Sequence, residues 1–418
     1  MKFLALLLCF IPVSAYAYLD PASGSALFYL IITIVSSTFF LTKRYFIDFI
    51  AKIRTMFSSQ EATKKEASDI VFYSEGAHYW QVFAPIIEQL CQQNQKVLYL
   101  TSAKNDEGLQ YENPMYSANY IGSPLIACSY LNNLKTKFLG LTAPQLDVFN
   151  LKKTKNIKHY AHIIHAPIDI HLYRKFAFDY FDSVFCSGPH QLKSLEALEK
   201  TRRTPKKELF RTGLTYLDYL KEKKESLPQS TSDKKTILIA PSWKDHCILN
   251  LIGSDLIDSL IGDDFHILLR PHPQTYSSFP HIIKNIEDRF SSRIEIDRSQ
   301  DPLYALNKCD ILISDLSGII WDFIYLFDKP IILFDPHWDL KGFEGTEIEH
   351  LAWDIRTIQD FIPRFSKQDL SLIREKVKNL LVDFDSKNYQ QVRSESLFNS
   401  GESAKIAAKQ IQEILAQL

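Results

Sequence analysis

The sequence predicts an α/β fold in which two doubly wound units face each other across a cleft. Short apolar runs, typical of buried parallel strands, recur between residues 70 and 334. Segments with apolar residues at helical spacing separate these runs, which is the alternation that a parallel sheet covered by helices requires. A charged stretch with Pro228 and a Ser/Thr run divides the alternation into two parts of similar length.

Composition narrows the class of protein. The 418 residues are enough for two or three domains, and a net charge of −1 gives no case for nucleic-acid binding. Aromatic residues are plentiful and glycines few, which favours a packed globular body. The six cysteines are scattered without a C-x-x-C pair, so we expect reduced thiols and no zinc site built on paired cysteines.

The first 59 residues predict attachment to a membrane. Residues 1–17 have the pattern of a secretory signal, with Lys2, an apolar run and a small-x-small end. Residues 18–59 hold a second apolar run, Ala26 to Thr42, at the short end of a membrane span. The basic residues after it are expected in the cytoplasm, which gives an inner-membrane anchor with a cytoplasmic body. A secreted chain with a buried helix there is the alternative. These basic residues are Lys43, Arg44, Lys52 and Arg54.

Two domains are expected after this segment, at residues 60–225 and 226–418. In the first we predict strands at 70–73, 97–100, 138–141, 159–164 and 183–186, with helices such as 78–93 and 191–199 between them. In the second we predict strands at 236–240, 265–269, 293–296, 311–313 and 331–334, a helix at 319–327 and a final amphipathic helix at 404–418.

Polar residues follow several of these strands, where such sheets bind ligands. After 311–313, small polar residues lead into a helix, and the free N–H groups of a helix start form an anion site. The alternative is that the serines merely cap the helix. The residues at the strand exits are Ser242, Trp243, Arg270, His272, Ser314, Asp315, Ser317 and Gly318.

Two prolines enclose His272 in the run Arg270-Pro271-His272-Pro273, and they fix the backbone at a strand exit. An arginine there can hold a phosphate bidentately, and a histidine can donate to a phosphate oxygen or move a proton. The alternative is a structural arginine paired with a neighbouring acid.

His165 ends the strand at 159–164 and stands three residues after His162. That spacing puts the two side chains on opposite faces of a strand, so a shared metal is not expected. His165 is either a general base facing the cleft or a structural histidine. His78, which follows Gly76 at the start of the first predicted helix, is also placed where it can face the cleft.

Four motifs in this order resemble the CDP-glycerol glycerophosphotransferase family, which builds and primes teichoic acids. They are H-A-P at 165–167, A-P-S-W-K at 240–244, L-R-P-H-P at 269–273, and S-D-L-S-G-I-I-W-D-F from Ser314 followed by K-P-I-I-L-F. The resemblance spans about residues 70–395. It implies a GT-B-like fold of two Rossmann-like domains with CDP-glycerol bound mainly by the second.

The resemblance also implies roles for single residues. His165 is expected as the base or acceptor-positioning group, and Arg270 and His272 are expected at the donor phosphates. Asp322 matches the aspartate of the family's F-D pair, with Trp321 before it. Two departures concern the acceptor loop, which lacks the family's glycine and lysine, and Gly318, which replaces a serine.

The expected reaction transfers glycerol phosphate from CDP-glycerol to a lipid-linked or polymer acceptor with release of CMP, as in capsule or lipopolysaccharide assembly. We expect no cofactor and no obligatory metal in the site. Two alternatives stay open: a GT-B glycosyltransferase or epimerase-like enzyme that uses a nucleotide sugar, and an inactive membrane-tethered binding protein of a polysaccharide system.

Overall fold

The computed structural model describes residues 32–38, 42, 68–228, 234–243, 245–299, 301–335 and 341–418. The chain divides into two compact units, Met1–Lys65 and Glu66–Leu418, and the description below concerns the second. The signal-like segment 1–17 and most of the apolar run 26–42 lie outside the described residues. Residues 32–38 are helical, and no helix of the described part is long and apolar enough to cross a bilayer. The predicted transmembrane anchor stays a prediction, because most of its residues lie outside the described part.

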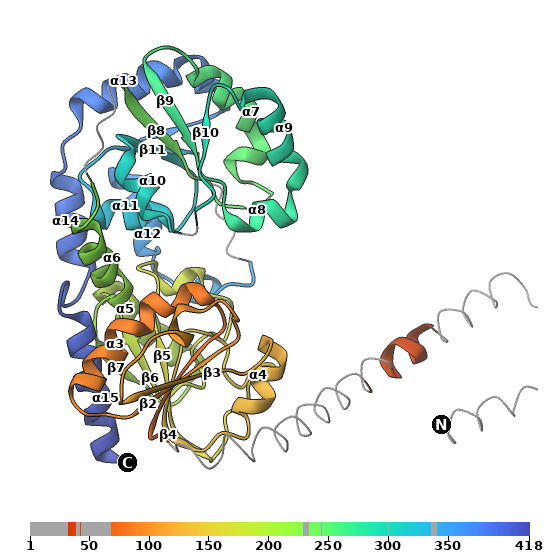
Figure 1. Cartoon of the computed structure of the whole chain (residues 1–418), viewed down its shortest axis with the longest axis vertical. Coiled ribbons are helices and arrows are strands. Elements are labelled where there is room, and N and C mark those ends of the chain that lie inside the picture. Colours follow the sequence, from red (N-terminus) through yellow and green to blue (C-terminus); the bar gives the residue numbers. More distant parts are fainter. Residues whose placement is uncertain are drawn as a thin grey trace, which may run out of the picture. The chain divides into compact units, whose positions relative to one another are not determined.

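The first half of the larger unit is built on a seven-stranded sheet in which every strand pair is parallel (Figure 1). Its strand order, β3-β2-β1-β4-β5-β6-β7, reverses direction between β1 and β4. Ligands of such sheets bind outside the carboxyl ends of the strands at this reversal. The strands are β1 (Ile70–Ser74), β2 (Val97–Thr101), β3 (Tyr116–Tyr120), β4 (Thr136–Leu141), β5 (Ile157–Ile163), β6 (Ser183–Cys186) and β7 (Glu208–Arg211).

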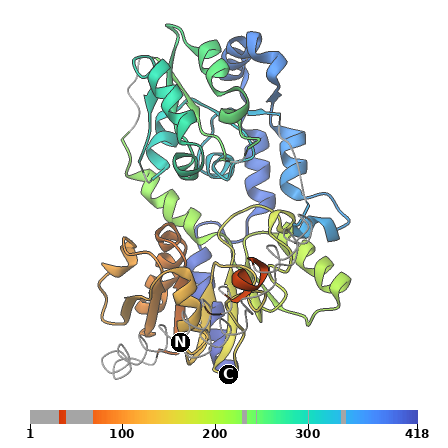
Figure 2. The ribbon, with the colours of Figure 1, turned by 90° about the vertical axis from the view of Figure 1, so that its right-hand side faces the viewer.

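The second half repeats this plan with a six-stranded parallel sheet in the order β10-β9-β8-β11-β12-β13. Here the order reverses between β8 and β11, so the residues that follow these two strands lie at the expected ligand position. Figure 2 shows the two sheets in separate halves of the larger unit. The strands are β8 (Lys235–Ile239), β9 (Phe265–Leu269), β10 (Glu295–Ile296), β11 (Ile311–Ser314), β12 (Ile331–Phe334) and β13 (Arg364–Phe365).

Helices cover both sheets. Short 3₁₀ turns lie at η1 (Ala77–Tyr79), η2 (Glu107–Leu109), η3 (Ile170–Leu172), η4 (Glu344–Glu347) and η5 (Lys367–Leu372). The α-helices are α3 (Trp80–Gln92), α4 (Pro124–Leu131), α5 (Pro189–Arg202), α6 (Thr215–Glu225), α7 (Ile248–Leu260), α8 (Pro273–Ser278), α9 (Pro280–Phe290), α10 (Leu303–Lys308), α11 (Ile319–Leu326), α12 (Trp353–Phe361), α13 (Ile373–Asp383), α14 (Lys387–Ser396) and α15 (Ser403–Gln417).

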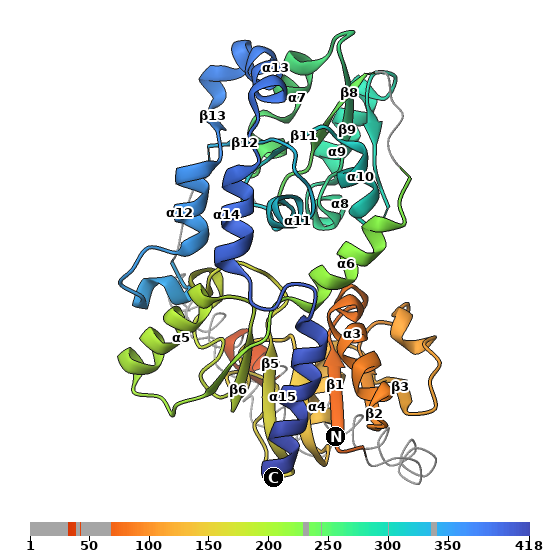
Figure 3. The ribbon, with the colours of Figure 1, turned by 90° about the vertical axis from the view of Figure 1, so that its left-hand side faces the viewer.

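The chain returns to its first half at the end. Helix α15 packs against α3, α6 and β4, beside the first sheet (Figure 3). Ala407, Ala408, Ile411 and Ile414 are buried in this contact because they recur on one face of the helix. This packing differs from the expectation that residues 226–418 form one domain, and the domain boundaries themselves stay predictions.

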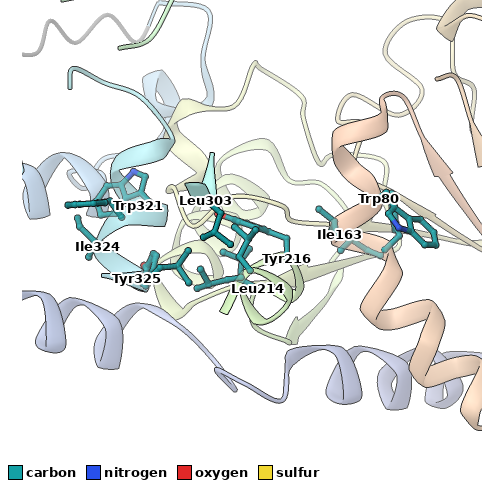
Figure 4. Packing of buried hydrophobic residues seen from close by; sticks show 14 of the residues in the cluster. Trp80, Ile163, Leu214, Tyr216, Leu303, Trp321, Ile324 and Tyr325 are labelled. Atoms are coloured by element: carbon teal, nitrogen blue, oxygen red, sulfur yellow. The ribbon is translucent and has the colours of Figure 1, made fainter. Parts of the chain in front are cut away.

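A single hydrophobic cluster runs through both halves. It includes Trp80 and Ile163 of the first sheet's layer and Trp321 of α11, and Leu214, Tyr216 and the side chains around them lie between these groups (Figure 4). Burial of this much apolar surface at α6 and α11 fixes the two halves against each other. The cysteines of the described part form no disulfide, as the sequence predicts.

Candidate active site between the two halves

A cavity of about 320 Å³ opens between the two halves of the larger unit. Residues of η1, of the loop after β5 and of α6 line it from one side, and the start of α11 and the start of α12 line it from the other. The side chains with chemistry to offer there are His78, His165, Tyr216, Ser317, Asp322 and Asp354. Four of the ten predicted site residues, His165, Ser317, Gly318 and Asp322, are therefore in this wall.

His165 follows β5 and lies deep in the cavity wall. Its Nδ1 is buried and has no hydrogen-bond partner in the described part of the chain. The ring packs edge-on against Tyr79, with 4.8 Å between the ring centroids. Burial and the neighbouring His78 lower the pKa of His165 to about 4, so the imidazole is neutral at physiological pH. A neutral histidine with a free ring nitrogen can accept a proton.

His78 lies on η1 beside the same cavity, as its position after β1 allows. Burial lowers its pKa as well. A Cβ at Gly76 would lie 2.8 Å from the His78 ring, so a side chain there would displace that ring. His162 points elsewhere: it is fully buried and packs edge-on against Phe178 and Phe181. The alternation along β5 thus separates His162 from His165.

Ser317 and Gly318 form the turn between β11 and α11. The N–H groups of Gly318 and Ile319 have no acceptor among the described residues, because the first bonds of the helix begin at Ile320 and Trp321. The Ser317 hydroxyl has no such partner either. Two N–H groups and a hydroxyl at the start of a helix form a site that favours an anion.

Ser314 and Asp315, in contrast, are held by the protein itself. The Ser314 hydroxyl donates to the carbonyl of Ala240 at 2.5 Å. Asp315 accepts hydrogen bonds from the N–H groups of Ser242 and Ile248, at 2.6 and 2.8 Å. Both side chains therefore position the loop after β8, and a direct contact with a ligand stays a prediction for each.

Arg270 is also engaged. Its Nη1 forms an ion pair with Asp297 and donates to the hydroxyl of Ser299 at 3.0 Å, and the side chain is 9% exposed. This is the structural alternative that the sequence left open for Arg270. Its role at a donor phosphate stays a prediction.

His272 caps α8, because its Nδ1 accepts a hydrogen bond from the N–H of Gln274 at 3.1 Å. This bond places the proton of the neutral ring on Nε2, which is then a donor. The His272 ring lies 6.3 Å from that of Trp243, which is 38% exposed. Neither residue lines the 320 Å³ cavity, but β8, β9 and β11 are neighbours, so their exits share one edge of the sheet with Ser317.

Asp322 lies one turn into α11 and is partly buried. It accepts a 2.5 Å hydrogen bond from the hydroxyl of Tyr216 on α6. Burial raises the pKa of Asp322 to about 6, although the Tyr216 hydrogen bond opposes the shift. The contact ties the helix that joins the two halves to the helix that carries the anion site.

Asp354 is the residue that the sequence did not reveal. It follows the first residue of α12, lines the cavity, and its buried Oδ2 has no partner in the described part of the chain. Burial and the charge of Asp169 raise its pKa to about 7. No motif marks Asp354, because the loop before α12 gives no strand exit to search.

Two parallel α/β sheets with a cavity between them define a protein of the GT-B-like class. The chain belongs to the CDP-glycerol:poly(glycerophosphate) glycerophosphotransferase family, whose profile matches residues 55–344. It is accordingly a CDP-glycerol glycerophosphotransferase by class, with CDP-glycerol as donor and a polymer as acceptor.

Solved structures share this architecture at low sequence identity. The wall teichoic acid polymerase TagF, a histidine-to-asparagine variant soaked with CDPG, is 17% identical with a TM-score of 0.55, over 90% of this chain and 98% of TagF. A putative UDP-N-acetylglucosamine 2-epimerase from Listeria monocytogenes is 13% identical with a TM-score of 0.57, over 84% and 98% of the two chains. The UDP-GlcNAc 2-epimerase of Neisseria meningitidis, bound to UDP-GlcNAc, is 17% identical with a TM-score of 0.53, over 82% and 99%. Similarity at these low sequence identities shows the fold alone. In a separate comparison, no curated protein matches the sequence.

Proposed function

We propose that the cavity is the place where glycerol phosphate passes from CDP-glycerol to a hydroxyl of a membrane-associated glycan or polyol-phosphate acceptor. One observation carries the proposal: the unpartnered Nδ1 of His165 and the free N–H groups at the start of α11 face the same cavity from opposite halves. A proton acceptor opposite an anion site is the pair that transfer of a phosphate to a hydroxyl requires.

In the proposed reaction, the acceptor oxygen forms a bond to the β-phosphorus of CDP-glycerol. The bond from that phosphorus to the bridging oxygen breaks, and CMP leaves with the electron pair. The proton of the acceptor hydroxyl goes to His165. Charge develops on the phosphoryl and bridging oxygens, and the N–H groups of Gly318 and Ile319 with the Ser317 hydroxyl would stabilise it.

The low pKa of His165 fits this order of events. Before the donor binds, burial keeps the ring neutral and its lone pair available. The negative charge of a pyrophosphate in the cavity would favour the imidazolium and raise the pKa toward the value that a general base needs. Asp354, with its free Oδ2, offers a second acceptor that can orient the attacking hydroxyl.

The remaining predicted residues would hold the rest of the donor. Trp243 offers an exposed aromatic face for the cytosine base, and Nε2 of His272 offers a donor for a phosphate oxygen. Ser314 and Asp315 would contribute by holding the loop after β8 in position. Arg270 would contribute by holding Asp297 and Ser299 in position.

The acceptor and the location complete the proposal. A lipid-linked acceptor at the cytoplasmic face of the inner membrane agrees with the apolar and basic residues before position 60. The loop after β5 lacks the family's glycine and lysine, which favours an acceptor different from that of the poly(glycerophosphate) polymerases.

The test is a donor screen with the full chain in membrane extract. We expect CMP release from CDP-glycerol and no nucleotide release from UDP-N-acetylglucosamine or UDP-glucose, with CDP-ribitol as the closest competitor. Release of UDP, or epimerisation without release, would assign the nucleotide-sugar chemistry instead. Binding of CDP-glycerol without any CMP release would favour the inactive binding protein.

A further inference from the structure

Four exposed lysines gather at the edge of the first sheet where its strands begin. Two of them directly precede β2 and β4, one lies two residues before β5, and one is the second residue of β5. This edge is opposite the active-site cavity, because residues that follow the other ends of β1 and β5 line that cavity. Nothing in the proposed reaction uses these lysines, here called the lysine rim, which are Lys96, Lys135, Lys155 and Lys158.

The strand register places these lysines side by side. Ile70 of β1 pairs with Val97 of β2 and with Phe138 of β4. Phe138 pairs in turn with His159 of β5. One step before these paired residues, the four neighbouring chains carry a row of charged residues, with about 4.8 Å between one chain and the next. In the order of the sheet, the row is Lys96, Asp69, Lys137 and Lys158.

The other charges of this edge partly cancel. Asp69 forms an ion pair with Lys137 at 2.7 Å, and Asp182 forms one with Lys153 at 2.6 Å. The four lysines of the rim have no ion pair among the described residues. Two acidic residues lie toward the flanking strands without an ion pair in the described part, namely Glu112 before β3 and Glu208 in β7. Positive charge is therefore in excess in the middle of this edge, at the starts of β2, β4 and β5.

Hydrogen bonds hold the backbone of the rim in place. The Ser68 hydroxyl donates to the carbonyl of Lys96 at 2.7 Å, which ties the start of β1 to the start of β2. The Thr136 hydroxyl donates to the carbonyl of Ser68 at 2.9 Å and adds the start of β4. The backbone that carries the lysines is thus ordered before any partner binds, so binding orders only the side chains.

The chain also enters the larger unit at this edge. Ser68 precedes β1, and residues 18–59, for which a membrane anchor is predicted, come shortly before it. Residues 60–67 join the two, and a segment of this length spans at most about 29 Å. An anchor within residues 18–59 would therefore keep the lysine rim close to the membrane surface.

We propose that the lysine rim binds the anionic head groups of phospholipids at the cytoplasmic face of the membrane. Lysines near such a surface are attracted to its phosphates over about one Debye length, ~8 Å at physiological ionic strength. A row of lysines on a fixed edge presents its charges to a flat surface together. The inference rests on the membrane location given under the proposed function, but not on the proposed reaction.

This orientation narrows the class of acceptor. Strand β5 has seven residues, Ile157–Ile163, and its rise of about 3.3 Å per residue makes it about 23 Å long. His165 follows the far end of β5, so it would stand roughly 20–25 Å above the head groups. A lipid head group cannot reach that height. The acceptor hydroxyl would instead lie at the end of a glycan or polyol-phosphate chain long enough to extend from the membrane to the cavity.

The test measures which lysines a membrane covers. The full chain is placed in vesicles that contain phosphatidylglycerol, in vesicles of phosphatidylcholine alone, and in detergent without vesicles, with no donor present. A water-soluble acetylating reagent modifies the accessible lysines, and mass spectrometry measures the modified fraction of each. Lys367, an exposed lysine at the start of η5 in the second half, is the internal reference.

We expect the modification of the rim lysines relative to Lys367 to fall about fivefold or more in the phosphatidylglycerol vesicles. The modification should return to its detergent level in phosphatidylcholine vesicles and at about 0.5 M salt, because salt screens the attraction. Equal modification of the rim and Lys367 in anionic vesicles would overturn the inference. Protection that persists in detergent or in neutral vesicles would overturn it as well, since another part of the chain or a second copy would then cover the rim.

A pair of double variants separates the rim from total charge. In Lys155→Glu/Lys158→Glu, the protection of Lys96 by anionic vesicles should disappear. In Lys221→Glu/Lys284→Glu, which changes the net charge equally at exposed lysines of α6 and α9, it should remain. Circular dichroism checks that both variants are folded. Equal protection of Lys96 in the two variants would contradict the rim, and because no donor is present, a failure of CMP release leaves this result unaffected.

Discussion

The Tyr216 hydroxyl donates a 2.5 Å hydrogen bond to the partly buried carboxylate of Asp322, and this contact links α6 to α11. Both side chains line the cavity between the two halves. The pair therefore connects the stability of the interface to the position of the anion site at the start of α11. The structure allows this connection to be tested apart from the chemistry.

Tyr216→Phe should destabilise the protein at pH 7. The substitution removes the donor and leaves a buried carboxylate oxygen without a partner, which costs about 1–3 kcal/mol of the free energy of unfolding. Urea unfolding followed by circular dichroism measures it. Tyr180→Phe, at a tyrosine that is 47% exposed, is the control and should cost less than about 0.5 kcal/mol. Equal effects of the two substitutions would contradict the assigned contact.

Asp322 should make stability depend on pH in a definite direction. Its folded-state pKa of about 6 lies above the unfolded value of 3.8, so the folded state favours the protonated carboxyl. The stabilising contribution is thus complete below pH 3.8 and is lost as the pH rises through about 6. The difference between the two pKa values corresponds to about 3 kcal/mol.

Asp322→Asn should remove this dependence. The free energy of unfolding of the wild type relative to Asp322→Asn should be larger at pH 4 than at pH 7.5, by up to about 3 kcal/mol. Asp288→Asn, at an exposed carboxylate on α9, is the control and should show no such change relative to the wild type. A difference that grows with rising pH would refute the protonated buried state of Asp322.

Gly318→Ser should raise stability slightly. The residue has an ordinary helical φ of −57°, and a Cβ there would meet nothing within 4 Å. Replacing glycine at such a position restricts the unfolded chain and contributes about 0.4–1 kcal/mol. The melting midpoint of the variant measures this. A lower midpoint than that of the wild type would show that the glycine is required by its surroundings.

The strands were predictable where both faces are buried. Apolar runs marked β1, β8, β9, β11 and β12 to within two residues, because strands covered by helices on both sides are mostly apolar. Sequence reasoning missed β3, β7 and β13, and predicted β10 too long. These four lie toward or at the sheet edges, where the side chains are partly exposed or the strand has only two residues, and no continuous apolar run appears.

The site was predictable in position but not in the partners of its side chains. Strand exits led to His165, Ser317 and Asp322, which line the cavity. The sequence could not show that Arg270 is paired with Asp297, or that Asp315 holds the backbone of Ser242, since these partners are distant along the chain and only the fold brings them together. Asp354 could not be predicted because it follows no strand exit and only the fold brings it to the cavity.

The pH dependence of CMP release should report the burial of His165. The pH profile of kcat/KM reports the free enzyme, and its acidic limb is expected near pH 4, the pKa of His165. The value of kcat/KM should rise with pH through this limb, because the neutral imidazole is the active form. The acidic limb of the pH profile of kcat reports the enzyme–substrate complex and should lie at higher pH, because the bound pyrophosphate favours the imidazolium form of His165. Steady-state rates between pH 4 and 8 measure both. Coincident limbs near pH 6.5 would contradict a buried His165.

The most direct test of the account is single-turnover release of CMP from CDP-glycerol by the wild type, His165→Ala and the exposed-site control His281→Ala. With all three chains shown to be folded by circular dichroism, we expect His165→Ala to be slower by about 10²–10⁴-fold while the control keeps the wild-type rate. A wild-type rate in His165→Ala would contradict the claim that the free nitrogen of His165 takes the proton of the acceptor opposite the start of α11.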